Sequence, residues 1–585
     1  MIRKLTLYVH TIRYLTGIQI WSQLTLLMKK RLFKRFIIRY TKSKNVSSWN
    51  RQIQLIKKPV HAQKPDYKNG IFIFINETHQ FSSGIEWNSP ELSKLWLYNL
   101  HYFDFLIPSC DNPSDKSFQE IKSILNQWID DNPIGTGNGW EPYPSSLRIV
   151  NWIYFYSFYQ KYFKIDHLFE NKFVQSLYYQ SIYLQFFFET HLLANHLFAN
   201  IKALFWSGCF FNKSRWVTKA KRLLISQMKE QILNDGGHFE RSPMYHTTIL
   251  MDVLDALGLL NSEKNNRRLE VDSELNKLLK KTALSMITWL KWLTHPDGRI
   301  ALFGDSALSI MPCLKEVCDY SQKVGILFST ESAKSENVDH TRLVDSGYDI
   351  FQSRNIYLVV DSGELGVSYQ PGHAHCDLAN YEFSFRGERM IVDSGVGEYL
   401  NTPLRKYTRS CKAHNTVCVE GLDQAELWST FRMGRRIGKI TSSVLKRDQD
   451  YILEVSYAND LQKKHPYFHR RKFKIFKSGF FVHDMVTGVN TFNSYIHIHP
   501  NCTLNVDANE IVVTKNDRNI IIHYQSSNTE MIIAEHVYTP EFGEQITMQT
   551  LVFTPKQNNN IVKYIISSER NFDWGNICNV FPNNV

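Results

Sequence analysis

Apolar residues recur with a helical period between about residue 90 and residue 310. The stretch Leu147–Tyr162 is apolar on nearly every side, which predicts a long and almost wholly buried helix. Turn signals such as Asp235-Gly236-Gly237 separate the periodic stretches, and Ser145 and Ser146 can cap the helix that follows them. The other predicted helices are Phe173–Phe188, His191–Trp206, Val217–Leu233, Thr247–Leu260 and Leu275–Leu293.

After about residue 345 the apolar period falls to two. Polar and apolar residues alternate in Arg471–Phe476, and Asn415–Val419 is a second short strand. Two further runs, Glu510–Val513 and Asn519–Ile522, flank the turn Lys515–Arg518. Many short strands separated by turns predict an antiparallel β-sandwich.

The order of these elements predicts an α+β multidomain protein. Helices come first and strands second, which argues against a parallel sheet of alternating strands and helices. Repeated helix pairs suggest a toroid or a solenoid, and the lack of a strict sequence repeat favours the toroid. We expect a basic, partly helical segment at 1–89, an α/α toroid at 90–325, a polar linker at Gly325–Asp345 and a β-sandwich at 345–585.

The formal net charge of +12 favours an anionic partner through long-range attraction. Nucleic acid, anionic lipid and acidic polysaccharide all qualify. No zinc-finger spacing, RNA-binding signature or sustained basic stripe is visible, so we expect no nucleic-acid partner. Aromatic residues make up 14% of the chain, which suits stacking on sugar rings or, equally, a large aromatic core.

Residues 1–44 are basic, and their apolar residues are interrupted by polar ones. No run of about 18 apolar residues predicts a transmembrane span, and no clear secretory signal is visible. The segment could contact an anionic membrane peripherally as a basic amphipathic helix. It could also be a solvated basic helix packed on the domain, and we favour this second interpretation.

The nine cysteines are sparse and contain no Cys-x-x-Cys pair. We therefore expect neither a disulfide framework nor a metal–thiolate cluster. Sparse cysteines are typical of a reducing compartment but are compatible with an oxidising one.

Two helical segments carry candidate chemistry. Asn195 and His196 interrupt an apolar helix, where polar groups are costly unless they have partners. A satisfied core pair is the ordinary explanation for them. The segment Asn234–His246 is dense in titratable groups, and its Ser242-Pro243 fits a helix cap and first helical residue. Capping does not explain Tyr245 so well.

The third candidate segment is Gly372–Asp377. If it is an extended strand, His373 and His375 point to one face. Together with Asp393 and His414, they form a plausible site for a divalent metal ion.

These segments together resemble the heparinase II/III-like polysaccharide lyases, which are related to some alginate lyases. The resemblance covers roughly residues 90–570, and several motifs in one order are more specific than any one alone. The matching motifs are Trp140–Arg148, Ala194–Leu197, Gly236–His246, Gly372–Asp377, Val392–Gly395, Ala413–Thr416, Asp423–Trp428 and Phe431-Arg432.

The resemblance implies an incomplete α/α toroid followed by an antiparallel β-sandwich, with the active site between them. It also implies β-elimination in an acidic polysaccharide, in which the proton on C5 of a uronate is removed and O4 leaves. Removing that proton builds negative charge on the uronate carboxylate, so fixed donors are needed there. Asn195 and His196 would supply those donors.

Tyr245 would protonate O4, and His373 or Tyr245 would be the base, depending on the uronate epimer. A Tyr with its ordinary pKa of ~10 is a poor base at neutral pH. A neighbouring cation or metal ion would have to lower that pKa.

The resemblance also assigns a metal site. His375, Asp393 and His414 match the family's metal-binding positions, and zinc is the expected ion. We interpret the ion as mainly structural, holding the strand that carries His373. Cys376 is a conceivable extra ligand that we do not expect to bind.

Four further residues are candidates for binding substrate. Trp140 and Arg148 could form part of the sugar-binding groove or simply pack the toroid. Glu240 and Arg241 could contact substrate or pair with each other.

Two other functions remain open. A toroid glycoside hydrolase needs two carboxylates about 5–10 Å apart, and Glu141, Asp235 and Glu240 are available. A non-catalytic polysaccharide-binding or assembly protein would have no need of Tyr245. The family's lyases are typically exported, so the cell envelope or periplasm is the expected location, with a cytoplasmic or membrane-peripheral one open. A role in making or trimming the cell's own acidic exopolysaccharide would fit, and the residues do not identify the polymer or the oligomeric state.

Overall fold

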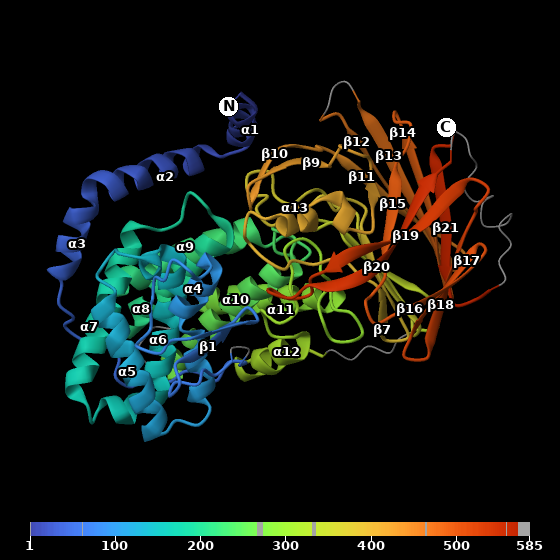
Figure 1. Ribbon diagram of the computed structural model, residues 1–585. Coiled ribbons are helices and arrows are strands. Elements are labelled where there is room, and N and C mark those ends of the chain that lie inside the picture. Colours follow the sequence, from blue (N-terminus) through green and yellow to red (C-terminus); the bar gives the residue numbers. More distant parts are fainter. Residues whose placement is uncertain are drawn as a thin grey trace.

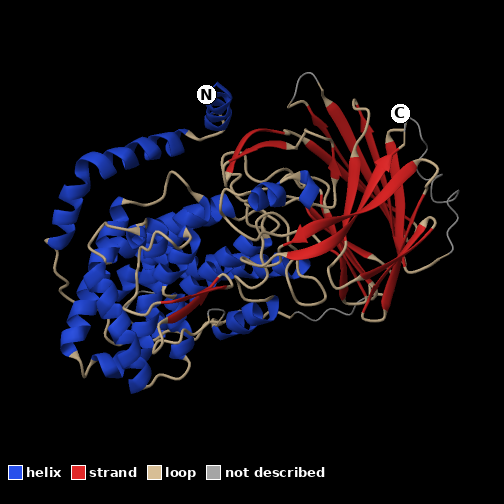
Figure 2. Ribbon diagram, in the orientation of Figure 1, coloured by secondary structure: helices blue, strands red, loops and turns tan. Residues whose placement is uncertain are grey.

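The computed structural model describes residues 2–60, 63–265, 273–329, 335–461, 465–556 and 559–570. Helices fill the first half of the chain and antiparallel strands the second, as Figures 1 and 2 show. The predicted α+β class, with a helical toroid followed by a β-sandwich, is therefore confirmed.

The helical domain consists of α-helices that pack in consecutive pairs around one aromatic-rich core. Apolar residues lie on nearly all sides of the central helices α6 to α8, which explains why these helices are buried. The elements are α4 (Lys94–Tyr102), η2 (Asp104–Cys110), α5 (Asp115–Asp131), η3 (Asn138–Trp140), α6 (Pro142–Phe163), α7 (His167–Phe186), α8 (Ala194–Phe210), α9 (Ser214–Gln231), α10 (Pro243–Asn265), α11 (Ser273–Trp292) and α12 (Leu314–Lys323).

The helices start a few residues away from their predicted positions, and for α6 and α8 the reason is visible in the structure. Helix α6 begins at Pro142, so Ser145 lies inside it and donates to the Gly139 carbonyl instead of capping it. Pro142 suits the first helical position because its missing N–H would have no helical partner there. Helix α8 begins later than predicted because Leu193 and Ala194 have positive φ angles of 62° and 48°.

The strand domain contains antiparallel sheets that enclose a second core. Rings from the eight-stranded sheet meet rings from the other sheets, as in the contact of Phe383 with Phe480 at 5.1 Å between ring centroids. The eight-stranded sheet has the order β11 (Ile440–Arg447), β12 (Asp450–Asn459), β13 (Tyr467–Phe476), β14 (Gly479–Thr487), β21 (Ile561–Ser567), β18 (Arg518–Tyr524), β17 (Glu510–Lys515), β16 (Thr503–Asp507).

Smaller sheets complete this domain. The five-stranded sheet is β3 (Asp339–Leu343), β4 (Tyr348–Gln352), β5 (Ile356–Asp361), β6 (Tyr381–Phe385) and β7 (Glu388–Ile391). The four-stranded sheet is β19 (Thr529–Tyr538), β20 (Ile546–Pro555), β15 (Asn493–His497) and β8 (Val417–Cys418). Strands β9 (Ala425–Trp428) and β10 (Arg432–Arg436) pair separately, and α13 (Pro403–Arg409) and η4 (Cys411–Ala413) lie in the connections.

The predicted strands are present, and one boundary is wrong. Strands β17 and β18 pair around the turn at Asn516 and Asp517, whose positive φ angles fit a tight hairpin. Strand β3 lies inside the segment Gly325–Asp345 that we expected to be a linker. Strand β3 pairs with β4, and the polar sequence of the segment did not indicate that a strand would form there.

The first part of the chain forms an N-terminal arm, residues 2–42, followed by a hairpin. The arm comprises α1 (Ile2–Ile12), α2 (Gly17–Met28), the π-helical turn η1 (Lys29–Phe33) and α3 (Lys34–Lys42). In Figure 1 it runs as dark-blue helices from α1, beside β10, to α3, beside α7. The hairpin of β1 (Ile71–Phe74) and β2 (Glu77–Gln80) was not predicted. Among the described residues, no helix is long and apolar enough to cross a membrane.

Candidate active site

A tyrosine and a histidine from the two domains stack at the centre of the candidate site. Tyr245 lies in the first turn of α10, and its ring centroid is 3.7 Å from that of His373. Ser242 accepts a hydrogen bond from the Tyr245 amide, so the predicted cap is confirmed. The Tyr245 hydroxyl lies 3.1 Å from the hydroxyl of Tyr399.

Burial raises the pKa of Tyr245 well above its usual range, and nearby Tyr399 and Asp305 add to that rise. The phenol therefore keeps its proton at neutral pH. Tyr245 could act as a base at neutral pH only with a lowered pKa, and the structure raises that pKa instead. Tyr245 is suited to donate a proton.

His373 is oriented by a buried carboxylate. Its Nδ1 lies 2.8 Å from Asp305 Oδ2, so Nδ1 carries the proton and donates it to Asp305. The other nitrogen, Nε2, is left as the acceptor and lies 3.4 Å from Asn195 Nδ2. His373 is suited to accept a proton at Nε2.

Asp305 is fully buried and is held ionised by its partners. Burial alone would raise its pKa, but the Arg405 guanidinium, with further bonds from His373 and His375, holds the pKa well below its usual range. Arg405, in α13, donates to Asp305 Oδ2 at 2.8 Å. At Gly304, with φ of 58°, a Cβ atom would lie 2.8 Å from the His373 carbonyl, so the close approach of the two loops needs glycine.

The segment that carries His373 and His375 is a loop, not the strand that we predicted. The two rings nevertheless converge, because each donates to a different oxygen of Asp305. Their common orientation comes from this carboxylate and not from strand alternation.

Asn195 and Glu240 form the second side of the site. Asn195 Nδ2 donates to Glu240 Oε2 at 3.0 Å, and both side chains are buried. Within the described part of the chain, Glu240 Oε1 has no hydrogen-bond partner. Burial raises the pKa of Glu240, although His373 and Asn195 counteract this rise.

His196 follows Asn195 in the first turn of α8. Its Nδ1 lies 3.1 Å from Glu189 Oε1, and its ring lies 4.5 Å from that of Tyr143. Burial lowers the pKa of His196, but the Glu189 carboxylate outweighs this effect and the pKa is raised. The imidazole is therefore biased toward its cationic form, which can bind an anion.

A cavity of about 400 Å³ lies beside these groups, between the two domains. Tyr102, Tyr143 and Tyr245 line it from the toroid, and Tyr399 and Phe542 line it from the strand domain. Aromatic walls with polar edges are typical of sites that bind sugar rings.

Three predicted substrate-binding residues lie elsewhere. Trp140 is buried in the toroid and donates to the Asn132 carbonyl. Arg148 is fully buried and donates to the carbonyls of Gly139 and His101. Arg241 contacts carbonyls of the strand domain, at Glu364 and Asp345, and does not pair with Glu240. Trp140 and Arg148 thus have the packing role that we had considered as the alternative.

The structure adds five residues that sequence reasoning missed: Tyr143, Glu189, Asp305, Tyr399 and Arg405. Asp305 gave a detectable signal, because it is a lone acid within the apolar run Ile300–Ile310. Tyr143 lies inside a motif that we had singled out for other residues. The rest gave no signal, since their roles arise only from tertiary contacts.

A group of possible metal ligands lies behind His373. Single ligand atoms of His375, Asp377 and His414 all lie within 4.8 Å of one another. His375 Nδ1 and His414 Nε2 are buried and have no hydrogen-bond partner among the described residues. Two orphaned imidazole nitrogens facing a carboxylate fit a divalent ion.

Asp393, which we expected as the third ligand, is not in this group. Its Oδ2 lies 2.7 Å from His414 Nδ1, so it orients His414 from behind. Asp393 also accepts from the Gly395 amide. Asp377 takes its place because the loop after His375 turns the Asp377 carboxylate toward both imidazoles.

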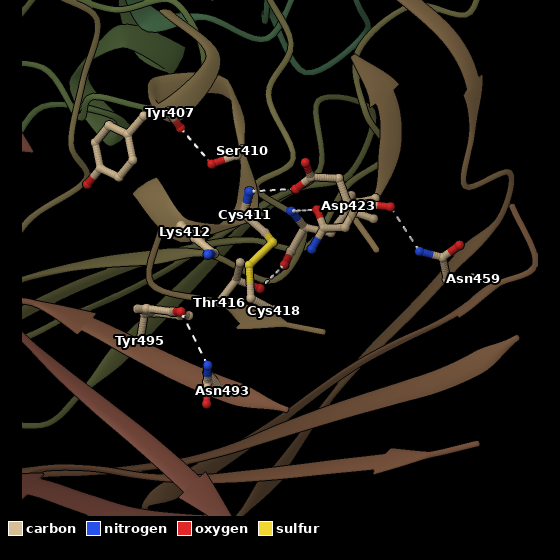
Figure 3. The surroundings of a disulfide bond; sticks show 12 residues. Tyr407, Ser410, Cys411, Lys412, Thr416, Cys418, Asp423, Asn459, Asn493 and Tyr495 are labelled. Atoms are coloured by element: carbon tan, nitrogen blue, oxygen red, sulfur yellow. Dashed lines mark hydrogen bonds between the residues drawn. A yellow bond between two sulfur atoms is a disulfide. The ribbon is translucent and has the colours of Figure 1, made fainter. Parts of the chain in front are cut away.

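One disulfide contradicts the expectation drawn from the cysteine count. Cys411 and Cys418 are bonded (Figure 3), with Cα atoms 5.6 Å apart. His414 lies in the loop between them. Asp423 accepts from the Cys411 amide beside the bond (Figure 3). The spacing of seven residues did not indicate a disulfide in the sequence. The two cysteines meet because the chain turns through η4 between them.

We expect Asp305→Asn to lower kcat about 10- to 100-fold with little change in KM. The amide would no longer fix the tautomer of His373, while the cavity would keep its shape. Asp349→Asn is the matched control, because Asp349 is also fully buried and lies 2.7 Å from His340 in the five-stranded sheet. The initial rates at which both variants cleave a polysaccharide that the parent protein cleaves measure the effect. Equal losses in the two would contradict the positioning role.

Comparison with known proteins agrees with this architecture over nearly the whole chain. Residues 27–329 match the family described as heparinase II/III N-terminus, and residues 336–575 match the family described as heparinase II/III-like, C-terminal. The crystal structure of heparinase III superposes with a TM-score of 0.68 at 17% identity, covering 92% of this chain and 91% of that one. Heparan sulfate lyase from Pedobacter heparinus superposes with a TM-score of 0.56 at 18% identity, covering 91% and 87%. At these identities the superpositions show the fold.

Two curated relatives are named heparin-sulfate lyase. That of Bacteroides thetaiotaomicron is 22% identical over 386 residues, which is 57% of this chain and 53% of the relative. That of Pedobacter heparinus is 26% identical over 229 residues, which is 36% and 33%. The chain thus matches between a third and about half of the length of these relatives. Since the two family descriptions together span almost all of the described residues, the chain belongs to the heparinase II/III family.

Proposed function

We propose that this protein is a polysaccharide lyase that cleaves an acidic, uronate-containing polysaccharide by β-elimination. The observation that carries the proposal is the stack of Tyr245 on His373. It places a phenol that keeps its proton against an imidazole whose Nε2 is the unprotonated nitrogen. An acid and a base of different protonation state, stacked beside a cavity that Tyr245 lines, suit a reaction that moves two protons.

The uronate carboxylate binds at the start of α8. The imidazole of His196 is biased toward its cationic form, the helix N-terminus favours negative charge, and Asn195 would redirect to the carboxylate the amide N–H that it donates to Glu240. These groups stabilise the charge that develops on the carboxylate when the C5 proton leaves.

The elimination then needs one base and one acid. His373 Nε2 takes the proton from C5, the C5–H electron pair becomes the C4–C5 double bond, and the C4–O4 bond breaks. Tyr245 gives its proton to O4, and later exchange with solvent restores both residues. The raised pKa of Tyr245 supports the acid role that we expected for it, and favours His373 as the base, a role that the sequence had left open between the two residues.

The carboxylates considered for a hydrolase do not support that alternative. Glu141 pairs with Lys94 at 3.0 Å, and Asp235 accepts from the amide and hydroxyl of Ser346. Of the three, Glu240 alone faces His373. A binding protein without catalysis would not need Tyr245 at the centre of the site.

Heparan sulfate is our first substrate candidate, because the relatives are named for cleaving heparin-type polymers. Other uronate polymers, including an acidic bacterial exopolysaccharide, come second. The test incubates the protein with heparan sulfate, heparin, hyaluronan, alginate and acidic exopolysaccharides, and follows the ultraviolet absorbance of unsaturated uronate. A rise with one polymer class supports the lyase and names its substrate. New reducing ends without absorbance on any polymer would overturn it in favour of a hydrolase.

We further propose that His375, Asp377 and His414 hold a divalent ion, with zinc the best match to two imidazoles and a carboxylate. When bound, the ion would tie the loop that carries His373 to the disulfide-closed loop that carries His414. Its contribution is structural, since the groups assigned to proton transfer belong to other residues.

We expect the purified protein to contain about one zinc ion per chain, and a chelator to lower its melting temperature. Asp377→Asn should lose the metal because it removes a ligand. Asp393→Asn should keep the metal but weaken its affinity about 10- to 100-fold, because it removes only the partner of His414. Elemental analysis and thermal melts measure both effects. A protein that contains no metal, and whose melting temperature is the same with and without the chelator, would contradict the proposed metal site.

A further inference from the structure

Helices α1 and α2 of the N-terminal arm, residues 2–42, expose most of their apolar residues. In α2, Trp21 is 69% exposed, and Ile20, Leu24, Leu27 and Met28 are exposed on the same side. On the side that faces the protein, Leu26 packs against the helical core, Gln19 is 2% exposed and donates to the Tyr369 carbonyl, and Lys29 donates to the Phe186 carbonyl. Hydrogen bonds dock the helix while most of its apolar residues point outward.

Helix α1 repeats this arrangement, whereas α3 also packs Ile37 against the helical core. In α1, His10 lies 2.8 Å from Glu426 and Thr11 donates to the Met433 carbonyl, while Leu5, Val9 and Ile12 are exposed. Leu32, Phe33 and Phe36, in η1 and α3, are exposed as well. We call these residues, together with those of α2, the apolar face of the arm. A contiguous exposed apolar face usually marks a binding surface.

The excess charge of the protein also lies in this arm. Of the 68 Lys and Arg residues, eleven fall within the first 50 positions, where no Asp or Glu occurs. The other 57 basic residues nearly balance the 56 acidic ones. The net charge of +12, which we took to favour an anionic partner, therefore comes almost entirely from this first part of the chain.

We propose that the arm binds the surface of an anionic membrane, with its apolar face in the lipid interface and its basic side chains on the headgroups. Helix α2 continues through η1 into α3, whose residues are strongly basic, and among the described residues no helix is long and apolar enough to cross a membrane, so the arm lies along the surface. A carbohydrate would need the charges but not the apolar face. A second copy of the arm would meet it with like charge. This inference replaces the packed, solvated helix that we favoured from the sequence.

The test is a flotation assay of the full-length protein with vesicles of phosphatidylcholine, either alone or with phosphatidylglycerol added. We expect the protein to float with the anionic vesicles, less at high salt, and little with neutral ones. The triple variant Trp21→Ser, Leu24→Ser, Met28→Ser should lower the partition coefficient at least about tenfold. Replacing Lys30, Arg31 and Arg35 by Gln should lower it about fivefold for each charge removed.

The matched control is Ile165→Ser, Leu168→Ser, which removes two apolar residues that are 82% and 86% exposed outside the arm. It should float like the parent, and unchanged circular dichroism shows that all variants fold. Absence of binding to anionic vesicles, or equal binding by the triple variant, would overturn the proposal. So would a concentration-dependent dimer in sedimentation that the triple variant abolishes, because a second copy would then cover the face.

Discussion

Tyr245→Phe is expected to lower kcat about a thousandfold while KM changes little. Phenylalanine keeps the ring that stacks on His373, and removes only the hydroxyl that protonates O4. Without this acid, O4 must leave as an unprotonated alkoxide, and the barrier rises. The initial rate of unsaturated-uronate formation on the active polymer measures the effect.

Tyr399→Phe is the matched control for that substitution. It removes the hydroxyl 3.1 Å from that of Tyr245 but leaves the proton donor in place. We expect a loss of about tenfold or less, since only one neutral hydrogen bond to the acid is removed. If Tyr245→Phe kept the parental kcat, or if both variants lost the same factor, Tyr245 would not be the acid.

The second large effect is on stability. Arg471→Leu should destabilise the protein by about 3–5 kcal/mol, because it leaves Asp484 in the core without the guanidinium counter-charge, bonded to His469 and Ser494. Arg471 donates to both oxygens of Asp484 at 2.7 Å and to the carbonyls of Ala379 and Asn415. Those carbonyls lie close in sequence to Asp377 and His414, so the pair also supports the loops behind the active site. Thermal melts followed by circular dichroism measure the loss.

The double variant Arg471→Leu, Asp484→Leu separates charge from packing. Since it removes the carboxylate that has lost its counter-charge, it should melt above the single variant. A double variant as unstable as the single one would show that the carbonyl contacts of Arg471, and not the ion pair, provide its stability.

The periodic parts of the chain could be predicted from sequence. Strand β13 alternates buried and half-buried residues over Tyr467–Phe476, which is the pattern that the sequence shows. Helix boundaries that depend on unusual backbone angles could not be predicted from sequence. Helix α8 starts at Ala194 because two residues adopt positive φ angles, and neither Leu193 nor Ala194 is a residue type that indicates this conformation.

The candidate site could be predicted only in part. The motifs singled out Asn195, Tyr245 and His373, which the structure brings together from two domains. Asp305 could not be assigned its role, because it lies 68 residues from His373 in sequence and meets it only after folding. Trp140 and Arg148 lie in a matching motif, yet their buried hydrogen bonds show that they hold the toroid together.

The most direct test of the elimination is the mass of the products formed in ¹⁸O-labelled water. β-Elimination adds no water, so each new non-reducing end should carry an unsaturated uronate, lighter by one water than a hydrolysis product and free of label. Hydrolysis would introduce one labelled oxygen at each cleavage and no double bond. Unlabelled, unsaturated products that Tyr245→Phe fails to form are the predicted result, and labelled, saturated products would contradict the account.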